Sequence, residues 1–272
     1  SYELSANIYI GKLKDLDKQI EALIQTIPDE DRKIVTTHGS LGYLESRYGL
    51  EVLVTVIPSL TTEDGVTPKG LVEVIEEIKE HKIKKFIYSA SASCYGNSKE
   101  IPTSEEAKIE ILSPYAFTKR MSEKLIIQQA KIKKFSFISL RFFNVYGPRQ
   151  IQAGNMATVI GIFEKQYLDK KVLTVVNPGS QTRKFTHVKD IVNGCCEVWK
   201  KNLNRHYSIY ENKSYSILDI AKMFNSKIRF LNRRKGERYK SSTVKYVGDI
   251  KIWPLKCKYK IRDYIQNYIN NN

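Results

Sequence analysis

The fold is decided by Lys85-Phe-Ile-Tyr-Ser89, by the segment from Ser113 to Lys131 that contains Tyr115-Ala-Phe-Thr-Lys119, and by Phe135 to Phe142. The first and third segments are short, rich in aromatic and β-branched residues, and predict strands. The middle segment predicts a helix. A strand, a helix and a strand in this order imply a right-handed crossover, so the two strands are expected to lie parallel in one sheet.

The same alternation continues on both sides of this unit. Before it, we expect a helix over 6–27, a strand over 33–37, a helix over 39–48, a strand over 51–57 and a helix over 67–81. After it, we expect helices over 157–170, 188–199 and 217–224, strands over 172–176 and 206–210, and an irregular basic stretch over 227–249. The pattern predicts an α/β protein with a doubly wound, Rossmann-like parallel sheet. A smaller C-terminal substrate-binding portion is expected from segments around 147–185 and 227–272.

Length, hydrophobic content and cysteine usage limit the classes of protein that this sequence fits. The chain has 272 residues, of which 42% are hydrophobic, enough for one large α/β domain or two modest ones. It contains no run of 18 apolar residues, and its first residues do not read as a signal peptide. None of the four cysteines forms a Cys-x-x-Cys pair, so reduced thiols and a cytoplasmic location are expected, without a membrane partner.

The net charge of +16 is unevenly distributed. Residues 1–84 carry 10 Lys and Arg against 15 Asp and Glu, whereas residues 85–272 carry 35 against 14. Such asymmetry can indicate a nucleic-acid surface, but the basic residues form no dense block. An anionic small substrate or plain solvated lysines are therefore favoured over nucleic acid, and a different origin of the two parts would produce the same asymmetry.

The spacing of Tyr115 and Lys119 suggests acid/base chemistry. Four residues apart on a helix, the two side chains lie on one face, and a nearby ammonium lowers a phenol pKa that is ordinarily about 10. A tyrosine activated in this way can act as a general base toward a sugar hydroxyl. An ordinary amphipathic pair would have the same spacing, so the motif is weak by itself.

Two further polar segments follow predicted strands. Ser91 follows the strand over 85–89, and Asn144 with Arg149 follows the strand over 135–142. The carboxyl ends of parallel strands face the crevice in which ligands bind, so these side chains are expected at one edge of the sheet. A serine after a strand can also simply cap a turn.

Together these residues resemble the NAD-dependent nucleotide-sugar epimerases and dehydratases of the extended short-chain dehydrogenase/reductase family, and in particular the UDP-glucose 4-epimerase type. The matching segments cover about residues 85–272. They are Ser91, Ser113-Pro-Tyr115, Lys119, Arg141-Phe-Phe-Asn144, Gly179 to Asp190, Arg233-Arg-Lys-Gly-Glu237 and Trp253-Pro254.

The resemblance implies specific roles. Ser91 would polarise the sugar oxygen, Tyr115 would be the acid/base, and Lys119 would lower the pKa of Tyr115. The NAD cofactor would be contacted by Tyr115, Lys119 and Phe142. The substrate, a nucleotide-diphosphate sugar, would be contacted by Asn144, Arg183 and Arg234, since arginine forms forked, charge-assisted hydrogen bonds. Solvated basic residues are the alternative for Arg183 and Arg234. His187 is expected to orient a loop.

The glycine-rich turn of that family does not occur before Ser91. Such a turn lets the backbone approach a pyrophosphate at a helix N-terminus. The nearest candidate has Gly39 and Gly42 at the right mutual spacing, but Thr36 stands at the first glycine position. We interpret it as a partial turn, with coincidence favoured over cofactor binding.

Residues 1–84 instead resemble a fragment of the zinc or manganese solute-binding proteins of ABC importers. The matching segments are Asn7 to Asp17, Ile34 to Tyr43, Arg47 to Glu51, Thr61 to Pro68 and the helix up to His81. His38 stands where that family has a metal ligand. A zinc site needs about three or four ligands, and no histidine here is paired at ligand spacing, so a metal site at His38 is disfavoured.

The two resemblances predict a chimera joined near residues 84 and 85, natural or engineered. Residues 1–84 would be a metal-receptor fragment that completes the sheet, and residues 85–272 would be the epimerase-like half. We expect a catalytically silent protein, because part of the cofactor site is missing. The alternatives are an active epimerase that uses Tyr115 and a residual metal-binding module at His38. A homodimer is an expectation from the resemblance.

Overall fold

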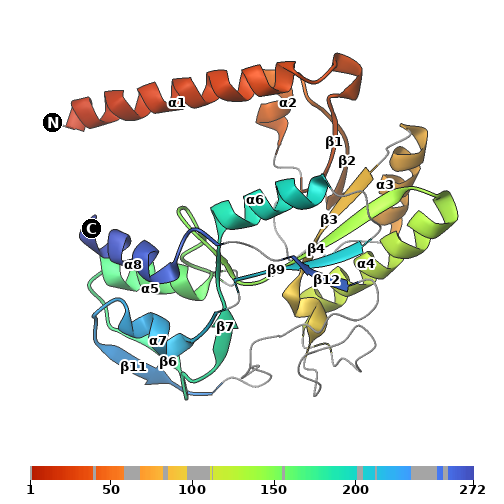
Figure 1. Ribbon diagram of the computed structural model, residues 1–272. Coiled ribbons are helices and arrows are strands. Elements are labelled where there is room, and N and C mark those ends of the chain that lie inside the picture. The colour runs from red at the N-terminus through yellow and green to blue at the C-terminus, as the bar shows by residue number, and fades with distance from the viewer. Residues whose placement is uncertain are drawn as a thin grey trace. The chain divides into compact units, whose positions relative to one another are not determined.

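The computed structural model describes residues 2–38, 41–57, 68–81, 85–96, 111, 113–154, 157–200, 205–211, 213–233, 250–253 and 257–272. The chain divides into two compact units, Ser1–Ile83 and Lys84–Asn272 (Figure 1). Within the part that the structure describes, no helix is long and apolar enough to cross a membrane.

The first unit contains a long helix and a small parallel sheet. Its elements are α1 (Tyr2–Gln25), η1 (Asp29–Asp31), β1 (Lys33–His38), α2 (Gly42–Tyr48), β2 (Glu51–Ile57) and α3 (Pro68–Glu80). Strands β1 and β2 are parallel, with Lys33 opposite Glu51. Asp17 of α1 accepts hydrogen bonds from Arg47 and from Tyr48, both of α2, which ties these two helices together. Gly49 ends α2 with a φ of 69°, a conformation that costs glycine little.

The second unit is built on a four-stranded parallel sheet. Its strands stand in the order β12 (Ile250–Trp253), β9 (Arg205–Ile209), β4 (Ser136–Phe142) and β3 (Lys85–Ser91). Helices α4 (Pro114–Lys133) and α6 (Val188–Trp199) pack on opposite faces of this sheet (Figure 1). Ile138, Leu140 and Ile209 of the strands pack against Ile191 and Val198 of α6. This arrangement confirms the predicted Rossmann-like α/β fold.

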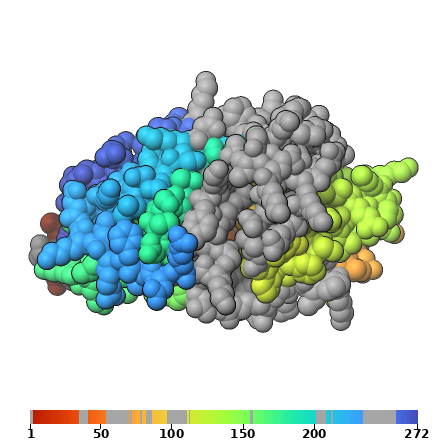
Figure 2. Space-filling model, turned by 90° about the horizontal axis from the view of Figure 1, so that it is seen from below, coloured from red at the N-terminus to blue at the C-terminus, as the bar shows by residue number. Residues whose placement is uncertain are grey.

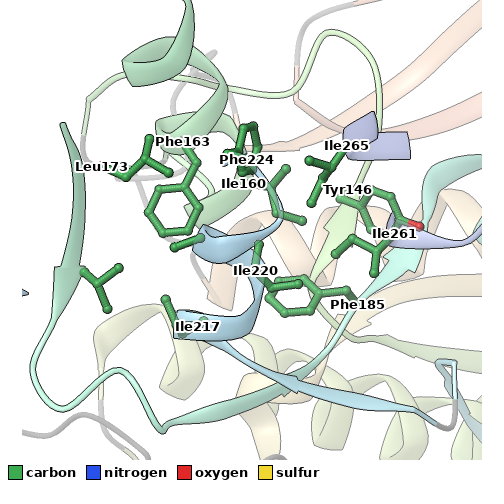
Figure 3. Packing of buried hydrophobic residues seen from close by; sticks show 12 residues of the cluster. Tyr146, Ile160, Phe163, Leu173, Phe185, Ile217, Ile220, Phe224, Ile261 and Ile265 are labelled. Atoms are coloured by element: carbon green, nitrogen blue, oxygen red, sulfur yellow. The ribbon is translucent and has the colours of Figure 1, made fainter. Parts of the chain in front are cut away.

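The rest of the second unit forms a smaller lobe with its own core. Its elements are β5 (Val145–Tyr146), α5 (Val159–Leu168), β6 (Leu173–Val176), β7 (Thr182–Lys184), β8 (Thr186–His187), β10 (Ser214–Ser216), α7 (Ile217–Lys222), β11 (Ile228–Leu231) and α8 (Ile261–Asn270). Strands β7 and β10 pair antiparallel and lie side by side on the surface in Figure 2. Figure 3 shows the core, in which Phe163, Leu173, Phe224 and Ile261 are fully buried.

The boundaries differ from the sequence prediction mainly in this lobe. The stretch predicted to be irregular over 227–249 contains β11, which pairs in parallel with β6. Backbone hydrogen bonds from Leu173 to Lys227 and from Asn177 to Leu231 extend that ladder, so tertiary pairing overrides the basic composition. The short strands β5, β7, β8 and β10 were not predicted, nor was α8, although the burial of Ile261 and Ile265 follows a helical period.

Candidate active site

The carboxyl edge of the sheet brings the predicted polar residues together. Ser91 is the last residue of β3, and it lies directly opposite Phe142, the last residue of β4. Asn144 follows two residues later and is exposed. As expected for parallel strands, one edge of the sheet therefore presents Ser91, Phe142 and Asn144 together.

Ser91 has two local roles. It caps η2 (Ala92–Tyr95), because its Oγ accepts hydrogen bonds from the backbone N of Ser93 at 3.1 Å and from the Ser93 hydroxyl at 2.9 Å. The capping interpretation of this serine is thus correct. A side-chain interaction with Ser91 also lowers the pKa of the Tyr115 phenol, so the two side chains lie near each other. The turn therefore holds Ser91 in place near the tyrosine.

The start of α4 sets the position of Tyr115. The Ser113 hydroxyl accepts a hydrogen bond from the backbone N of Ala116 at 3.2 Å, and Pro114 occupies the first helical position. Both features favour a helix start at this point. Tyr115 therefore lies in the first turn, where its side chain is 39% exposed and accessible to a ligand.

Lys119 lies one turn further along α4 than Tyr115. Its Nζ donates to the carbonyl oxygen of Ser89 at 3.0 Å and lies 6.0 Å from the centre of the Tyr115 ring. Burial raises the pKa of Tyr115, and the side-chain interaction with Ser91 opposes that rise. Lys119 is not among the groups that shift the pKa of Tyr115 here, where desolvation is the largest effect and the ammonium is directed at a backbone carbonyl, so its predicted effect on that pKa stays a prediction.

A buried ion pair beneath this site was not anticipated. Arg141 of β4 donates from Nε to Oε1 of Glu123 in α4 at 3.0 Å, and its Nη2 donates to Oε2. Both side chains are almost completely buried. Ser139 also donates to Glu123. The sequence does indicate that Glu123 lies on the same face of the helix as Tyr115 and Lys119, because these three residues follow one another at intervals of four.

A pocket of about 400 Å³ opens in the smaller lobe. One wall is apolar and includes Val159, Phe163, Val176, Phe185 and Leu231. Asn144 and Arg183 both line it, so the structure brings these two predicted substrate residues together. Its size and its mixture of apolar and polar groups are typical of sites for small molecules.

Local contacts orient the two predicted substrate residues. Asn144 has a φ of 31°, and its Nδ2 donates to the carbonyl oxygen of Lys184 at 2.9 Å. Arg183 of β7 donates from Nη1 to the carbonyl oxygen of Thr182 at 2.8 Å. These bonds hold an amide and a guanidinium at the same cavity.

His187 has a structural environment. Its Nδ1 accepts the backbone N–H of Lys189 at 3.2 Å and caps α6, and its ring stacks on Tyr259 with centroids 4.6 Å apart. Burial lowers its pKa, which favours the neutral ring that this cap requires. These contacts agree with the expectation that His187 orients a loop.

Several predicted residues cannot be placed. Gly39, Arg234 and the side chain of His38 lie outside the described residues. Gly42 is described: it opens α2, and a Cβ atom added there would meet nothing within 4 Å. The close helix–strand contact that the last glycine of a dinucleotide turn permits is therefore missing at Gly42. Among the described residues, no group of three His, Cys, Asp or Glu could hold a metal ion.

Comparison with known proteins agrees with this geometry. Residues 65–211, more than half of the chain, match the NAD dependent epimerase/dehydratase family. The chain belongs to this family. Residues 1–110 are similar to a second family, described as zinc-uptake complex component A, periplasmic. The two matched ranges overlap over residues 65–110.

Two relatives illustrate the likeness of sequence. The protein named uncharacterized UDP-glucose epimerase YtcB, from Bacillus subtilis, is 36% identical over 133 residues, which cover 49% of this chain and 40% of that protein. The UDP-glucuronate 4-epimerase of Thermodesulfobacterium geofontis is 31% identical over 138 residues, which cover 50% of this chain and 41% of that protein. The chain spans about half the length of the curated relatives that it matches.

Solved structures show the same fold. UDP-glucose 4-epimerase from Thermotoga maritima, solved with UDP-glucose, aligns with a TM-score of 0.68 at 20% identity and covers 93% of this chain and 80% of that one. UDP-glucuronic acid 4-epimerase from Bacillus cereus, solved with UDP-glucuronic acid and NAD, aligns with a TM-score of 0.63 at 26% identity. That alignment covers 85% of this chain and 78% of the other.

Proposed function

We propose that this protein binds a nucleoside diphosphate sugar in the pocket of its second unit. We also propose that it derives from a nucleotide-sugar 4-epimerase and has lost the catalytic activity. The observation that carries the proposal is the joint presence of Asn144 and Arg183 on a pocket of about 400 Å³ with an apolar wall. The lost turnover follows from the sequence, which has no glycine-rich turn before Ser91.

The pocket suits the two ends of such a ligand. A guanidinium forms paired, charge-assisted hydrogen bonds with phosphate oxygens, which is the role proposed for Arg183. The aliphatic wall, with the half-buried Val176 and Leu231, offers an apolar surface on which a nucleobase can lie. The excess of positive charge over residues 85–272 adds long-range attraction for an anion.

The residues present fit the NAD cofactor only in part. Tyr115, Lys119 and Phe142 stand together at the sheet edge, as the family resemblance requires of the nicotinamide side. The pyrophosphate side needs a turn in which the backbone comes close to the ligand, and neither Thr36 nor the open position of Gly42 meets that need. When bound, NAD would supply hydride transfer. Without it, Ser91 and Tyr115 can bind and orient a sugar hydroxyl but cannot oxidise it.

Retained epimerase activity is the second candidate. It is favoured by the influence of Ser91 on the pKa of Tyr115, which indicates that a proton donor and an acid/base candidate lie near each other at the sheet edge. In this role Ser91 would polarise the sugar oxygen, and Tyr115 would exchange a proton with it.

The two family matches support a mixed origin of the chain. One match reaches from residue 1 to 110 and the other from 65 to 211, so their overlap includes the proposed junction near residues 84 and 85. The net charge is −5 over residues 1–84 and +21 over residues 85–272. We propose that residues 1–84 are a metal-receptor fragment and that, in the sequence, this fragment replaces the cofactor-binding half of an epimerase.

Calorimetric titration of the full chain tests this function. UDP-glucose should bind saturably at one site, and NAD should give no saturable heat. Arg183→Ala should weaken binding of UDP-glucose about tenfold or more, because it removes a charged hydrogen-bond donor. Arg262→Ala is the matched control, since Arg262 is an exposed residue of α8 outside the pocket lining. Failure of UDP-glucose to bind would overturn the proposal, and saturable NAD binding would favour the active enzyme.

A further inference from the structure

The buried guanidinium of Arg141 joins the two segments that carry Ser91 and Tyr115. Arg141 is 3% exposed and lies in β4, next to Phe142 at the end of that strand. On one side it is bound to Glu123 of α4, and on the other its Cζ lies 4.7 Å from the centre of the Tyr95 ring in η2. Helix α4 carries Tyr115, and η2 is capped by Ser91.

Glu123 controls the placement of α4. Tyr115, Lys119 and Glu123 follow one another at four-residue intervals, so they form one stripe along the helix. A rise of 1.5 Å per residue puts Tyr115 about 12 Å from Glu123 along a rigid rod. A forked ion pair restricts both translation and rotation of that rod, because two parallel hydrogen bonds must be kept. Any translation or rotation of α4 at Glu123 would therefore also move Tyr115.

Tyr95 controls the placement of η2. Its hydroxyl lies 2.7 Å from the Ser208 hydroxyl of β9, and its ring packs against Phe143 with centroids 6.1 Å apart. The aromatic face also receives the Arg141 cation, an attraction that strengthens where water is excluded. The turn that holds Ser91 is thus fixed to the same guanidinium as α4.

A buried ion pair is a poor source of net stability, because desolvation of the two charges offsets their attraction. Its value lies in geometry: a displaced partner would leave an uncompensated charge in the interior, so few other arrangements are tolerated. Ser139 donates to Glu123 as well, which satisfies the carboxylate further. A buried ion-pair network of this kind, close to a candidate site, indicates that the positions of α4 and η2 must be closely fixed.

We infer that Glu123 and Arg141 are positioning residues that fix the distance between Ser91 and Tyr115. Neither residue touches the ligand in this scheme. The inference rests on the proposed roles of Ser91 and Tyr115, but it concerns their placement in the free protein. It therefore applies to a silent sugar-binding protein and to an active epimerase alike.

Titration of Tyr115 by NMR of ring-¹³C-labelled tyrosine tests the inference without any ligand. The resonance that disappears in Tyr115→Phe identifies the residue. In Glu123→Gln, a displaced α4 should separate Tyr115 from Ser91, so the phenol loses the interaction that lowers its pKa and its titration midpoint should rise. The double variant Glu123→Leu/Arg141→Met keeps an apolar core and can be as stable as the parent, yet it should show the same upward movement.

Tyr264→Phe is the matched control. It removes the 2.6 Å hydrogen bond from Tyr264 to Glu164 in the smaller lobe and should lower the thermal midpoint while leaving the titration of Tyr115 unchanged. If Glu123→Gln does not fold, the double variant decides. An unchanged Tyr115 midpoint in the folded variants, or an equal shift in Tyr264→Phe, overturns the inference. Binding of UDP-glucose is measured separately, so failure of the proposed function is distinguishable from failure of the positioning role.

Discussion

The Nζ atom of Lys119 donates a hydrogen bond to the carbonyl oxygen of Ser89 at 3.0 Å, which fastens α4 to the end of β3. In the opposite direction, the Tyr88 hydroxyl donates to the carbonyl oxygen of Lys119 at 3.3 Å. The lysine thus contributes to docking the helix on the strand, and the electrostatic environment of Tyr115 is set by burial and by Ser91. This division of roles leads to different predictions for substitutions at Ser91 and at Lys119.

Replacement of Ser91 by alanine should raise the pKa of Tyr115. The side-chain interaction with Ser91 lowers that pKa, so its removal leaves desolvation unopposed. The titration midpoint of the assigned Tyr115 resonance should therefore move further above 10. A midpoint that stays or falls would show that the two side chains are not in contact in solution.

Replacement of Lys119 by methionine should leave the pKa of Tyr115 in the free protein almost unchanged. The ammonium is bound to Ser89, and methionine retains most of the apolar stem. The same titration measures this outcome, with Ser91→Ala as the positive control. A clear upward shift in Lys119→Met would mean that the lysine swings onto the phenol in solution.

The sheet edge could be predicted from the sequence because its signals are local. Ser91 follows a strand, Tyr115 and Lys119 are one helical turn apart, and parallel pairing brings strand ends together without knowledge of any other contact. The pairing of Ser91 with Phe142 is the direct result.

Other features depended on partners far away in sequence. The direction of the Lys119 side chain was missed because a backbone carbonyl, which no motif records, competes with the phenol. Strand β11 was missed because Ile228 to Leu231 become a strand only when β6 supplies a partner. The Glu123–Arg141 pair joins residues 18 positions apart, and charge patterning along the sequence does not reveal that both are buried.

Two glycines in helices should respond to alanine in opposite ways. At Gly161 in the first turn of α5, an added Cβ atom would lie 2.4 Å from the carbonyl oxygen of Ile151, so Gly161→Ala should destabilise the second unit by about 1–3 kcal/mol. At Gly11 in α1 it would meet nothing within 4 Å, so Gly11→Ala should stabilise the first unit by about 0.5–1 kcal/mol. Urea unfolding followed by probes in each unit measures both. Stability changes of the same sign in the two variants would contradict the close contact between Gly161 of α5 and the carbonyl oxygen of Ile151.

The thiols of Cys195 and Cys257 should resist alkylation until strongly alkaline pH. Burial raises the pKa of each to about 11, and only the thiolate is nucleophilic. Exposed Cys196 should be modified first when iodoacetamide is followed by mass spectrometry. Since the folded chain binds these protons more tightly than the unfolded chain, their contribution to stability should be lost as pH rises from about 9 to about 11. Fast modification of Cys257 at pH 8 would show that its segment opens.

Removal of the Asp190 carboxylate should release the segment that leads into α8. Asp190 is 2% exposed and accepts hydrogen bonds from the backbone N atoms of Lys258 at 3.1 Å and Tyr259 at 3.2 Å. Asp190→Ala leaves both donors without this acceptor, so the second unit should lose about 1–3 kcal/mol. Hydrogen exchange should quicken at Lys258 and Tyr259, while the amide of Ile162, bonded to the carbonyl oxygen of Thr158 inside α5, should keep its protection unless the whole unit opens. Equal acceleration at all three amides would mean that Asp190 supports the unit as a whole.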